Sequence, residues 1–230
     1  MIICTVCGEA NDELLTVCSR CHSFLQAKVD ALDLFSTAWG LMERPGQTFR
    51  RIVLSRHKNY IFLLAGVAGV GVVFALLQAL RAGTRFGSIG LVFAAGPLIG
   101  IPFGILLLWV VAMISRVAGL AVGGKGTLRN LRAVWAYAAL PFIAAVLILL
   151  PVKLAIFGSY LFDPNPAPSV INPVLYYVLL GLDTLALLLT AVWSVFGLST
   201  SMGISKMRAL IPAAVVAAGF AAGFLVAASQ

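Results

Sequence analysis

The sequence has little charge, little histidine and few acids. Only 10% of its 230 residues are charged, and it contains eight Asp and Glu residues and two His. Both histidines, His22 and His57, lie outside the long apolar runs, so a Ser-His or Cys-His arrangement inside a bilayer is excluded. A membrane aspartyl protease needs two intramembrane acids, and these runs contain only Asp183. We therefore predict that the protein is not an enzyme.

Two further signals are absent. Gly123-Gly-Lys125-Gly-Thr127 resembles a phosphate loop, but that motif requires Ser or Thr directly after Gly-Lys, following a strand. Gly126 intervenes here, in a connection between expected helices. The first residues also lack the basic head, apolar run and cleavage site of a secretory leader. We expect neither nucleotide binding by this loop nor a leader in these residues.

Apolar residues are abundant. They form 61% of the chain, and the mean hydropathy of +1.05 lies outside the range of soluble domains. Five runs are long enough to cross a hydrocarbon core of about 30 Å as helices. The expected spans are residues 59–80, 88–117, 133–158, 172–200 and 209–228. The predicted fold class is an all-α integral membrane protein with a five-helix transmembrane bundle.

The distribution of basic residues predicts the orientation of these spans, because Lys and Arg accumulate in cytoplasmic segments. With the N-terminus inside, thirteen of the 16 Lys and Arg residues fall in cytoplasmic segments. The outer segments contain only Arg81, Arg85 and Lys153. We therefore expect a cytosolic N-terminus and a C-terminus on the outer side.

All cysteines lie within the first 21 residues, in two CxxC pairs separated by ten residues. They are Cys4, Cys7, Cys18 and Cys21. This spacing lets two knuckles place four thiolates tetrahedrally on zinc, which we prefer to disulfides or free thiols. His22 is expected to be a surface residue and not a fifth ligand. Zinc would supply most of the folding free energy of residues 1–29, and free thiols favour the reducing cytosol.

Residues 30–58 are expected to form short amphipathic helices along the membrane surface. The apolar residues of the first recur at three- and four-residue spacing: Leu32, Phe35, Trp39 and Met42. After Pro45, a second helix places Phe49, Ile52 and Val53 opposite a basic side. The basic residues expected to face lipid are Arg50, Arg51, Arg56 and Lys58. Anionic headgroups attract such residues by about 1 kcal/mol each, although an ordinary positive-inside anchor without lipid selectivity is preferred.

The fourth span contains Asp183 near its centre, where a charged Asp costs roughly 2.5–3.5 kcal/mol. Helical spacing aligns it with Tyr176 and Thr190 on a stripe that we expect to face protein. Pro97 and Pro102 of the second span free carbonyl groups at a similar depth. We expect a protonated Asp183 to donate to one of these carbonyls. This intramembrane polar site either locks the bundle or relays protons or ions.

Glycines recur every four residues in two spans. Gly96, Gly100 and Gly104 lie in the second span, and Gly219 and Gly223 lie in the fifth. Such stripes let helix backbones approach closely and can drive dimerisation. In a chain with five spans, packing within the bundle is the preferred use. The prolines of the second span also predict a tilt or a kink.

Four stretches read together resemble a known family. They are Pro45-Gly-Gln-Thr-Phe-Arg-Arg-Ile52, Leu131-Arg-Ala-Val-Trp-Ala-Tyr-Ala-Ala-Leu-Pro141, Ala191-Val-Trp-Ser-Val-Phe-Gly-Leu198 and Ser205-Lys-Met-Arg-Ala209. With five spans, residues 33–230 resemble the Yip family of Ypt/Rab-interacting membrane proteins. Eukaryotic members act in vesicle traffic and bind Rab GTPases through their cytosolic part. Where those members carry an acidic Asp-Leu-Tyr-Gly-Pro type motif, this chain has the cysteine segment and Trp39-Gly-Leu-Met-Glu-Arg-Pro45. In this respect the chain looks like a prokaryotic member of the family, in a bacterial or archaeal plasma membrane.

These observations predict three regions: a zinc ribbon at 1–29, amphipathic juxtamembrane helices at 30–58 and a Yip-like five-span domain at 59–230. The leading interpretation is a non-enzymatic membrane scaffold or adaptor that contacts a cytosolic protein through the ribbon, and it acts in membrane organisation or trafficking. The alternative is a small transporter or channel that uses Asp183 and a proline-broken second span. Nucleic-acid binding is disfavoured because residues 1–29 carry mixed charge. The chain could also form a homo-oligomer.

Overall fold

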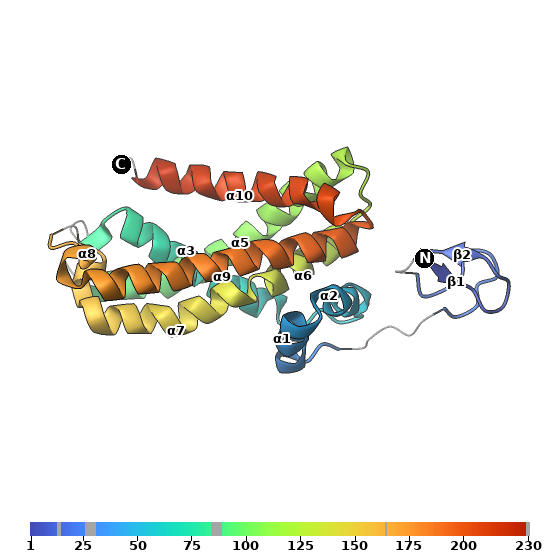
Figure 1. Cartoon of the computed structure of the whole chain (residues 1–230), viewed down its shortest axis with the longest axis horizontal. Helices are drawn as coiled ribbons and strands as arrows, with labels where there is room; N and C mark the ends of the chain where they lie inside the picture. Colours follow the sequence, from blue (N-terminus) through green and yellow to red (C-terminus); the bar gives the residue numbers. More distant parts are fainter. Residues whose placement is uncertain (13–14, 26–30, 84–88, 164, 229–230) are drawn as a thin grey trace.

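The computed structural model describes residues 1–12, 15–25, 31–83, 89–163 and 165–228. Helices dominate these ranges, and Figure 1 shows the long ones lying roughly side by side. The helices are α1 (Leu34–Glu43), α2 (Pro45–Leu54), α3 (Ile61–Ala79), α5 (Ile89–Ala121), α6 (Leu128–Ala138), α7 (Leu140–Phe157), α8 (Pro168–Ile171), α9 (Pro173–Met202) and α10 (Lys206–Ala228). A 3-10 turn follows α7 at Gly158–Leu161. Two short strands, β1 (Ile2–Ile3) and β2 (Ala10–Asn11), lie near the N-terminus.

Within the described ranges, five helical segments are long and apolar enough to cross a membrane. They correspond to α3, α5, α6 with α7, α9 and α10, which confirms the five spans predicted from the sequence. The third span begins earlier than expected, at Leu128, and its helix is interrupted at Ala139, two residues before Pro141. α5 runs unbroken past Pro97 and Pro102, so the expectation of a broken second span is wrong.

Capping residues explain where several helices begin and end. The Asp33 carboxylate accepts a hydrogen bond from Ser36 N at 2.7 Å, and this cap starts α1. Asn172 caps α9 in the same way by accepting from Leu175 N. α9 ends at Gly203, whose φ of +66° is the left-handed conformation that glycine adopts without strain.

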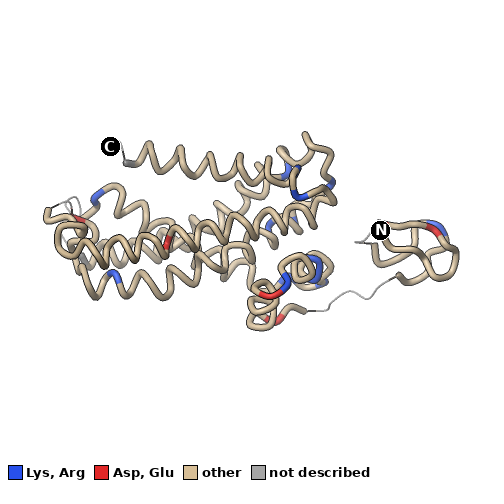
Figure 2. Tube along the Cα trace, viewed as in Figure 1, with Lys and Arg blue, Asp and Glu red and all other residues tan. Residues whose placement is uncertain are grey.

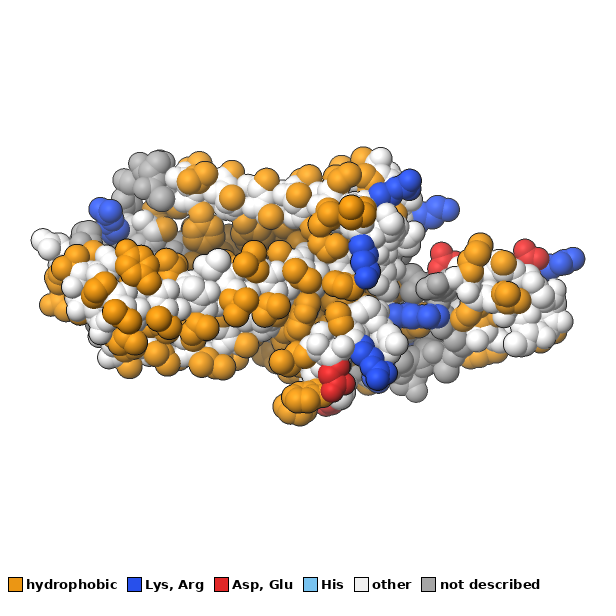
Figure 3. Space-filling view, viewed as in Figure 1, with side chains coloured by type: hydrophobic (Ala, Val, Ile, Leu, Met, Phe, Trp, Pro, Cys, Tyr) orange, Lys and Arg blue, Asp and Glu red, His pale blue; other side chains and the backbone are white. Residues whose placement is uncertain are grey.

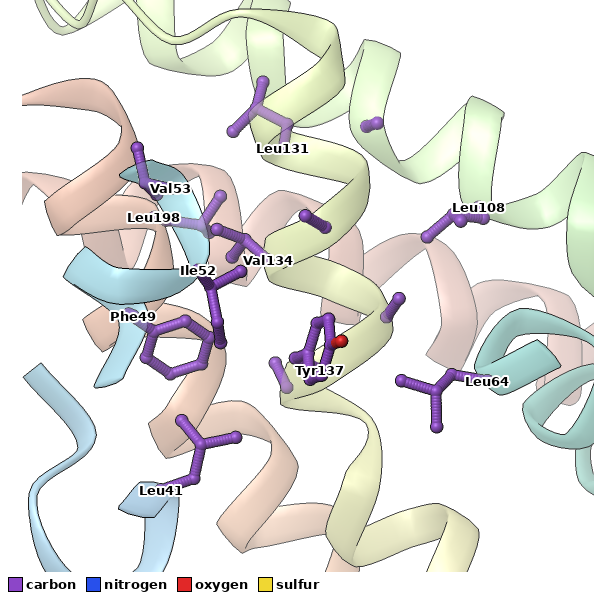
Figure 4. Close-up of a cluster of buried hydrophobic side chains, with 14 of the residues drawn as sticks. Leu41, Phe49, Ile52, Val53, Leu64, Leu108, Leu131, Val134, Tyr137 and Leu198 are labelled. Atoms are coloured by element: carbon purple, nitrogen blue, oxygen red, sulfur yellow. The ribbon is translucent and has the colours of Figure 1, made fainter. Parts of the chain in front are cut away.

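The main core lies where α2, α6 and α9 meet. It contains Phe49, Val134, Tyr137 and Leu198, all with no exposed surface (Figure 4). The apolar side of α2 was expected at the membrane surface, but it is buried against α6 and α9 instead. Gly197 makes this contact possible, because a Cβ at this position would collide with Val134 and approach Phe49 within 3.0 Å. The second amphipathic helix is therefore an integral part of the bundle.

A second core cluster lies farther along the bundle and joins α3, α5, α7 and α9. It is formed mainly by Val73, Phe74, Leu77, Val92, Phe157, Phe162 and Leu179. Figure 2 shows Lys and Arg gathered at the other end of the bundle, near α2 and the turn between α9 and α10. The two ends of the bundle thus differ in charge.

Candidate metal centre and polar groups of the membrane domain

The four cysteines lie in two matching hairpins. β1 and β2 pair antiparallel, Ile2 with Asn11 and Ile3 with Ala10, and enclose the first CxxC pair. An isolated antiparallel bridge between Val17 and Phe24 encloses the second pair. In each hairpin the residue after the knuckle has a left-handed backbone, Gly8 with a φ of +71° and His22 with +56°. This turn directs backbone N–H groups toward the sulfur atoms.

The hairpins bring the four sulfur atoms together. Every Sγ atom of Cys4, Cys7, Cys18 and Cys21 lies within 4.8 Å of the others. The Cys4–Cys21 and Cys7–Cys18 Sγ distances are both 3.6 Å. Four thiolates bound tetrahedrally at a zinc–sulfur distance of about 2.3 Å lie about 3.8 Å apart, so the arrangement fits a tetrathiolate metal site.

Neighbouring polar groups support negative charge on two of the sulfurs. The Ser23 hydroxyl, 3.0 Å from Cys4 Sγ, and the N–H groups of Cys7 and Val6 lower the pKa of Cys4 to about 6. The N–H of Cys21 is the largest of the influences that lower the pKa of Cys18. The site thus favours thiolates before any metal arrives.

The remaining thiols, such as that of Cys7, would lose their protons only with a nearby cation to offset the added negative charge. The Glu9 N–H favours a charged Cys7, yet the pKa of Cys7 rises to about 12 because Cys21, burial and the other two thiols act against it. Cys4, Cys7, Cys18 and Cys21 would together hold a divalent metal, whose positive charge would offset this repulsion. Asn11 adds a further contact, because its Nδ2 lies 3.5 Å from Cys18 Sγ while its Oδ1 accepts from Ser19 N. Sequence reasoning missed Ser23 and Asn11, since neither residue is part of the CxxC pattern.

The four basic residues expected to face lipid have different environments. Arg51 and Arg56 are exposed and Arg50 is half-buried. The Lys58 Nζ donates to the carbonyls of Ile52 at 2.7 Å and Val53 at 3.0 Å, at the C-terminal end of α2. Burial, with a contribution from the charge of Arg129, lowers the pKa of Lys58 to about 8. Lys58 is therefore a helix-capping residue.

The intramembrane polar site differs from the prediction. Asp183 was expected to donate to a carbonyl of the second span, but its Oδ2 instead accepts from Lys153 Nζ of α7. Both side chains are largely buried, at 29% and 16% exposure. Each charge offsets the other, which lowers the cost of placing either side chain in the membrane domain.

The remaining members of that site are separated from Asp183. α9 packs mainly on α2, α6, α7 and α10, whereas Pro97 and Pro102 belong to α5, which packs mainly on α3, α6 and α10. Tyr176 contacts the Phe157 ring edge-on, with centroids 6.3 Å apart. The Thr190 hydroxyl is buried and makes no hydrogen bond within the described residues. The stripe on α9 does face protein, but it forms no common site with the prolines.

A comparison with protein-family models decides the family. Residues 39–228 match the Yip1 domain, which covers all five spans together with the second half of α1 and all of α2. The chain belongs to the Yip1 domain family. Comparisons with curated proteins and with solved structures returned no match. The protein is accordingly an integral membrane protein, as the resemblance implied.

The Yip1 domain contains the Lys153–Asp183 pair but not the cysteine cluster. α2 and the Lys153–Asp183 pair lie inside the matched residues, whereas all four cysteines lie before them. Burial of α2 in the main core explains why a membrane domain includes a helix too short to span. The thiol cluster is an addition to the Yip1 domain of this chain.

Proposed function

We propose that this Yip1-domain protein is a non-enzymatic membrane adaptor whose N-terminal segment folds around zinc and binds a protein partner in the cytosol. The single observation that carries the proposal is the cluster of four sulfur atoms, within 4.8 Å of one another, outside the membrane domain. Figure 1 shows this segment beside the helical bundle, and Ile3, Val6 and Phe24 of the segment are exposed. Zinc ribbons of this kind are structural, because all four metal positions are filled by protein.

The proposed orientation has the ribbon in the cytosol and the C-terminus outside. It is supported by the concentration of Lys and Arg at the end of the bundle near α2 (Figure 2). A reducing compartment also keeps the four thiols available for metal. Reporter fusions at the two termini test the orientation: signals on opposite sides support it, and signals on the same side contradict it.

Metal content tests the zinc site. The full chain, purified under reducing conditions, is expected to contain one zinc per chain by elemental analysis. Cys18→Ser should contain almost none, because three ligands cannot close the site. His22→Asn is the matched control, since Asn tolerates the left-handed backbone at this position, and it should retain zinc. Loss of zinc in the control, or retention in Cys18→Ser, would contradict the assignment.

Quantitative cross-linking in cells tests the adaptor role. Neighbours of the wild-type chain should be compared with those of Cys18→Ser and His22→Asn at equal membrane abundance. A cytosolic protein recovered with the wild type and the control, but lost with Cys18→Ser, supports the adaptor. Identical neighbours for all three chains would contradict it.

The transporter alternative receives less support from the structure. It relied on a broken second span next to Asp183, but α5 is continuous and Asp183 pairs with Lys153 on another helix. No catalytic group is implied by these contacts either, since the pair neutralises its own charges. We therefore propose structural stabilisation as the role of the Lys153–Asp183 pair.

A further inference from the structure

α1 has two apolar sides, and only one is buried by protein. Thr37 and Leu41 are 5% and 0% exposed and face α2, where the close contact of Gly40 with Thr48 leaves no room for a larger residue. The other side consists of Phe35, Trp39 and Met42, which are 79%, 57% and 72% exposed. Figure 3 shows hydrophobic side chains on the outer side of α1, with acidic side chains beside them. A stripe of this kind normally has an occupant.

The length of α9 places α1 near the membrane surface. Its 30 residues span about 45 Å, which exceeds the ~30 Å hydrocarbon core. α2 meets α9 at Gly197, roughly 8 Å before the end of α9 at Met202. If the excess length is shared between the two sides, the α1–α2 pair lies at the level of the lipid headgroups.

Aromatic and basic residues mark the same level. Arg132 lies over the ring of Trp109 at 3.7 Å, and Trp135 Nε1 donates to Ser115 at 2.8 Å. Trp193 packs against the core cluster that contains α2. With Trp39, these are the four tryptophans of the chain. Tryptophan and arginine concentrate at membrane interfaces, where an apolar body meets a polar surface.

An open groove on α1 combines this aromatic surface with one charge of each sign. Its volume is about 570 Å³, and it is lined by Phe35, Ser36, Trp39, Gly40, Glu43 and Arg51. Trp39 Nε1 donates to Glu43 Oε1 at 2.8 Å, which fixes the ring beside the carboxylate. Arg51 is exposed, and no acid of the described residues forms a salt bridge with it. The groove therefore offers an unpaired guanidinium next to an aromatic and acidic wall.

We propose that this groove binds the headgroup of a zwitterionic phospholipid of the adjacent leaflet. The phosphate contacts the guanidinium of Arg51, which is suited to bind phosphate oxygens in pairs. The ammonium group lies against the rings of Trp39 and Phe35, close to the Glu43 carboxylate. Phosphatidylglycerol lacks that ammonium, so nothing in its headgroup offsets the charge of the Glu43 carboxylate. The proposal is independent of the zinc ribbon.

Lipid binding to the purified full chain tests the proposal. Native mass spectrometry in detergent would be used to titrate phosphatidylethanolamine and phosphatidylglycerol with matched acyl chains. The wild type is expected to bind phosphatidylethanolamine several-fold more tightly. Arg51→Gln should weaken this binding by about tenfold or more, because it removes a charge-assisted contact to phosphate. Arg56→Gln, an exposed arginine that does not line the groove, should change it by less than about twofold.

A second variant tests the selectivity. Glu43→Gln is expected to reduce or reverse the preference for phosphatidylethanolamine, because the repulsion of the anionic lipid is removed. All substituted side chains are exposed, and an unchanged melting temperature of each variant confirms that it is folded. Equal binding by Arg51→Gln and Arg56→Gln, or a wild-type preference for phosphatidylglycerol that Glu43→Gln leaves unchanged, would overturn the proposal. Equally strong competition by soluble glycerophosphoethanolamine would overturn the membrane as the source of the headgroup.

Discussion

α5 and α10 contain the same glycine spacing, but only one of them uses it inside the bundle. Gly100 and Gly104 of α5 lie directly against the backbone of α3 at Gly69 and Val70, where an added Cβ would collide with main-chain atoms. A Cβ at Gly219 or Gly223 of α10 would meet no atom of the described part of the chain within 4 Å. The prediction of internal packing is therefore confirmed for the second span and wrong for the fifth.

The contrast shows what a glycine stripe specifies. It creates a shallow surface that permits close approach, but the approach also requires a partner helix with a matching shallow surface. α3 supplies that surface through Gly69, which contacts both Gly100 and Gly104. Among the described residues, no such helix faces the later turns of α10. Substitutions at four places test this contrast between helix surfaces that are covered by protein and surfaces that are open.

The α3–α5 contact should be the most sensitive. Gly69→Ala places a methyl group against the backbone of Gly100 and Gly104, which cannot turn aside as a side chain could. Overpacking of this kind costs roughly 3 kcal/mol, which corresponds to a melting temperature about 6–12 °C lower in detergent. Gly66→Ala is the control on the same helix, because its Cβ would lie 3.4 Å from Ile101, an ordinary contact. Equal melting temperatures for the two variants would remove the contrast.

The contact between α7 and α9 contains the Lys153–Asp183 ion pair and does not depend on a glycine stripe. Asp183→Ala leaves Lys153 unpaired and should reduce the free energy of unfolding by roughly 2–3 kcal/mol, below the usual range for a fully buried pair because Asp183 is partly exposed. Lys153→Met combined with Asp183→Leu should restore most of the stability. Thermal unfolding of the single and double variants measures this coupling. A double variant as unstable as Asp183→Ala would show that the pair does not act as a unit.

The attachment of α2 should respond to pH through Lys58. Its pKa in the folded state is about 8, below the ordinary value of 10.5, so folding disfavours its charged form. The resulting penalty is complete below pH 8 and decreases as the pH rises from about 8 to 10.5. Stability should therefore increase over this window by about 1 kcal/mol, after discounting for the partial exposure of Lys58. Lys58→Met should lack this increase, and parallel pH profiles of the two proteins would contradict the assignment.

The open half of α10 should be the least sensitive. Gly219→Ala and Gly223→Ala add methyl groups into open space and should change the free energy of unfolding by no more than about 0.5 kcal/mol. Gly219→Leu should leave the molecular mass in detergent unchanged, as measured by light scattering. A decrease from dimer to monomer would instead show that a second copy of the chain covers this surface.

Much of the fold could be predicted from local sequence, since each span is recognised by its own apolar length. The thiol cluster was also predictable, because the CxxC spacing itself encodes the knuckles. The partner of Asp183 was not predictable in this way. Counting depth to the end of α7 places Lys153 near the outer surface, but the 3-10 turn at Gly158–Leu161 extends the chain beyond that point. The long lysine side chain then reaches an acid located deeper in the bundle.

The packing of α2 against α6 and α9 could not be predicted either, because it also depends on residues far away in the sequence. Its pattern of Phe49, Ile52 and Val53 opposite arginines is the same for a helix on lipid and a helix on protein. The deciding residue is Gly197, almost 150 positions away, which opens the space that Phe49 occupies. Amphipathicity therefore predicted a buried side for α2 but not the surface that buries it.

The length of α9 also has a mechanical consequence. Because α9 is longer than the hydrocarbon core that it crosses, a change in bilayer thickness moves the membrane–water boundary along α9. Both ends of the helix still remain outside the hydrocarbon core. In a thicker bilayer the α1–α2 pair would lie closer to the acyl chains, and in a thinner bilayer it would lie in water. The protein should therefore tolerate membranes of different thickness, and the thickness should determine how far the α1–α2 pair is exposed to water.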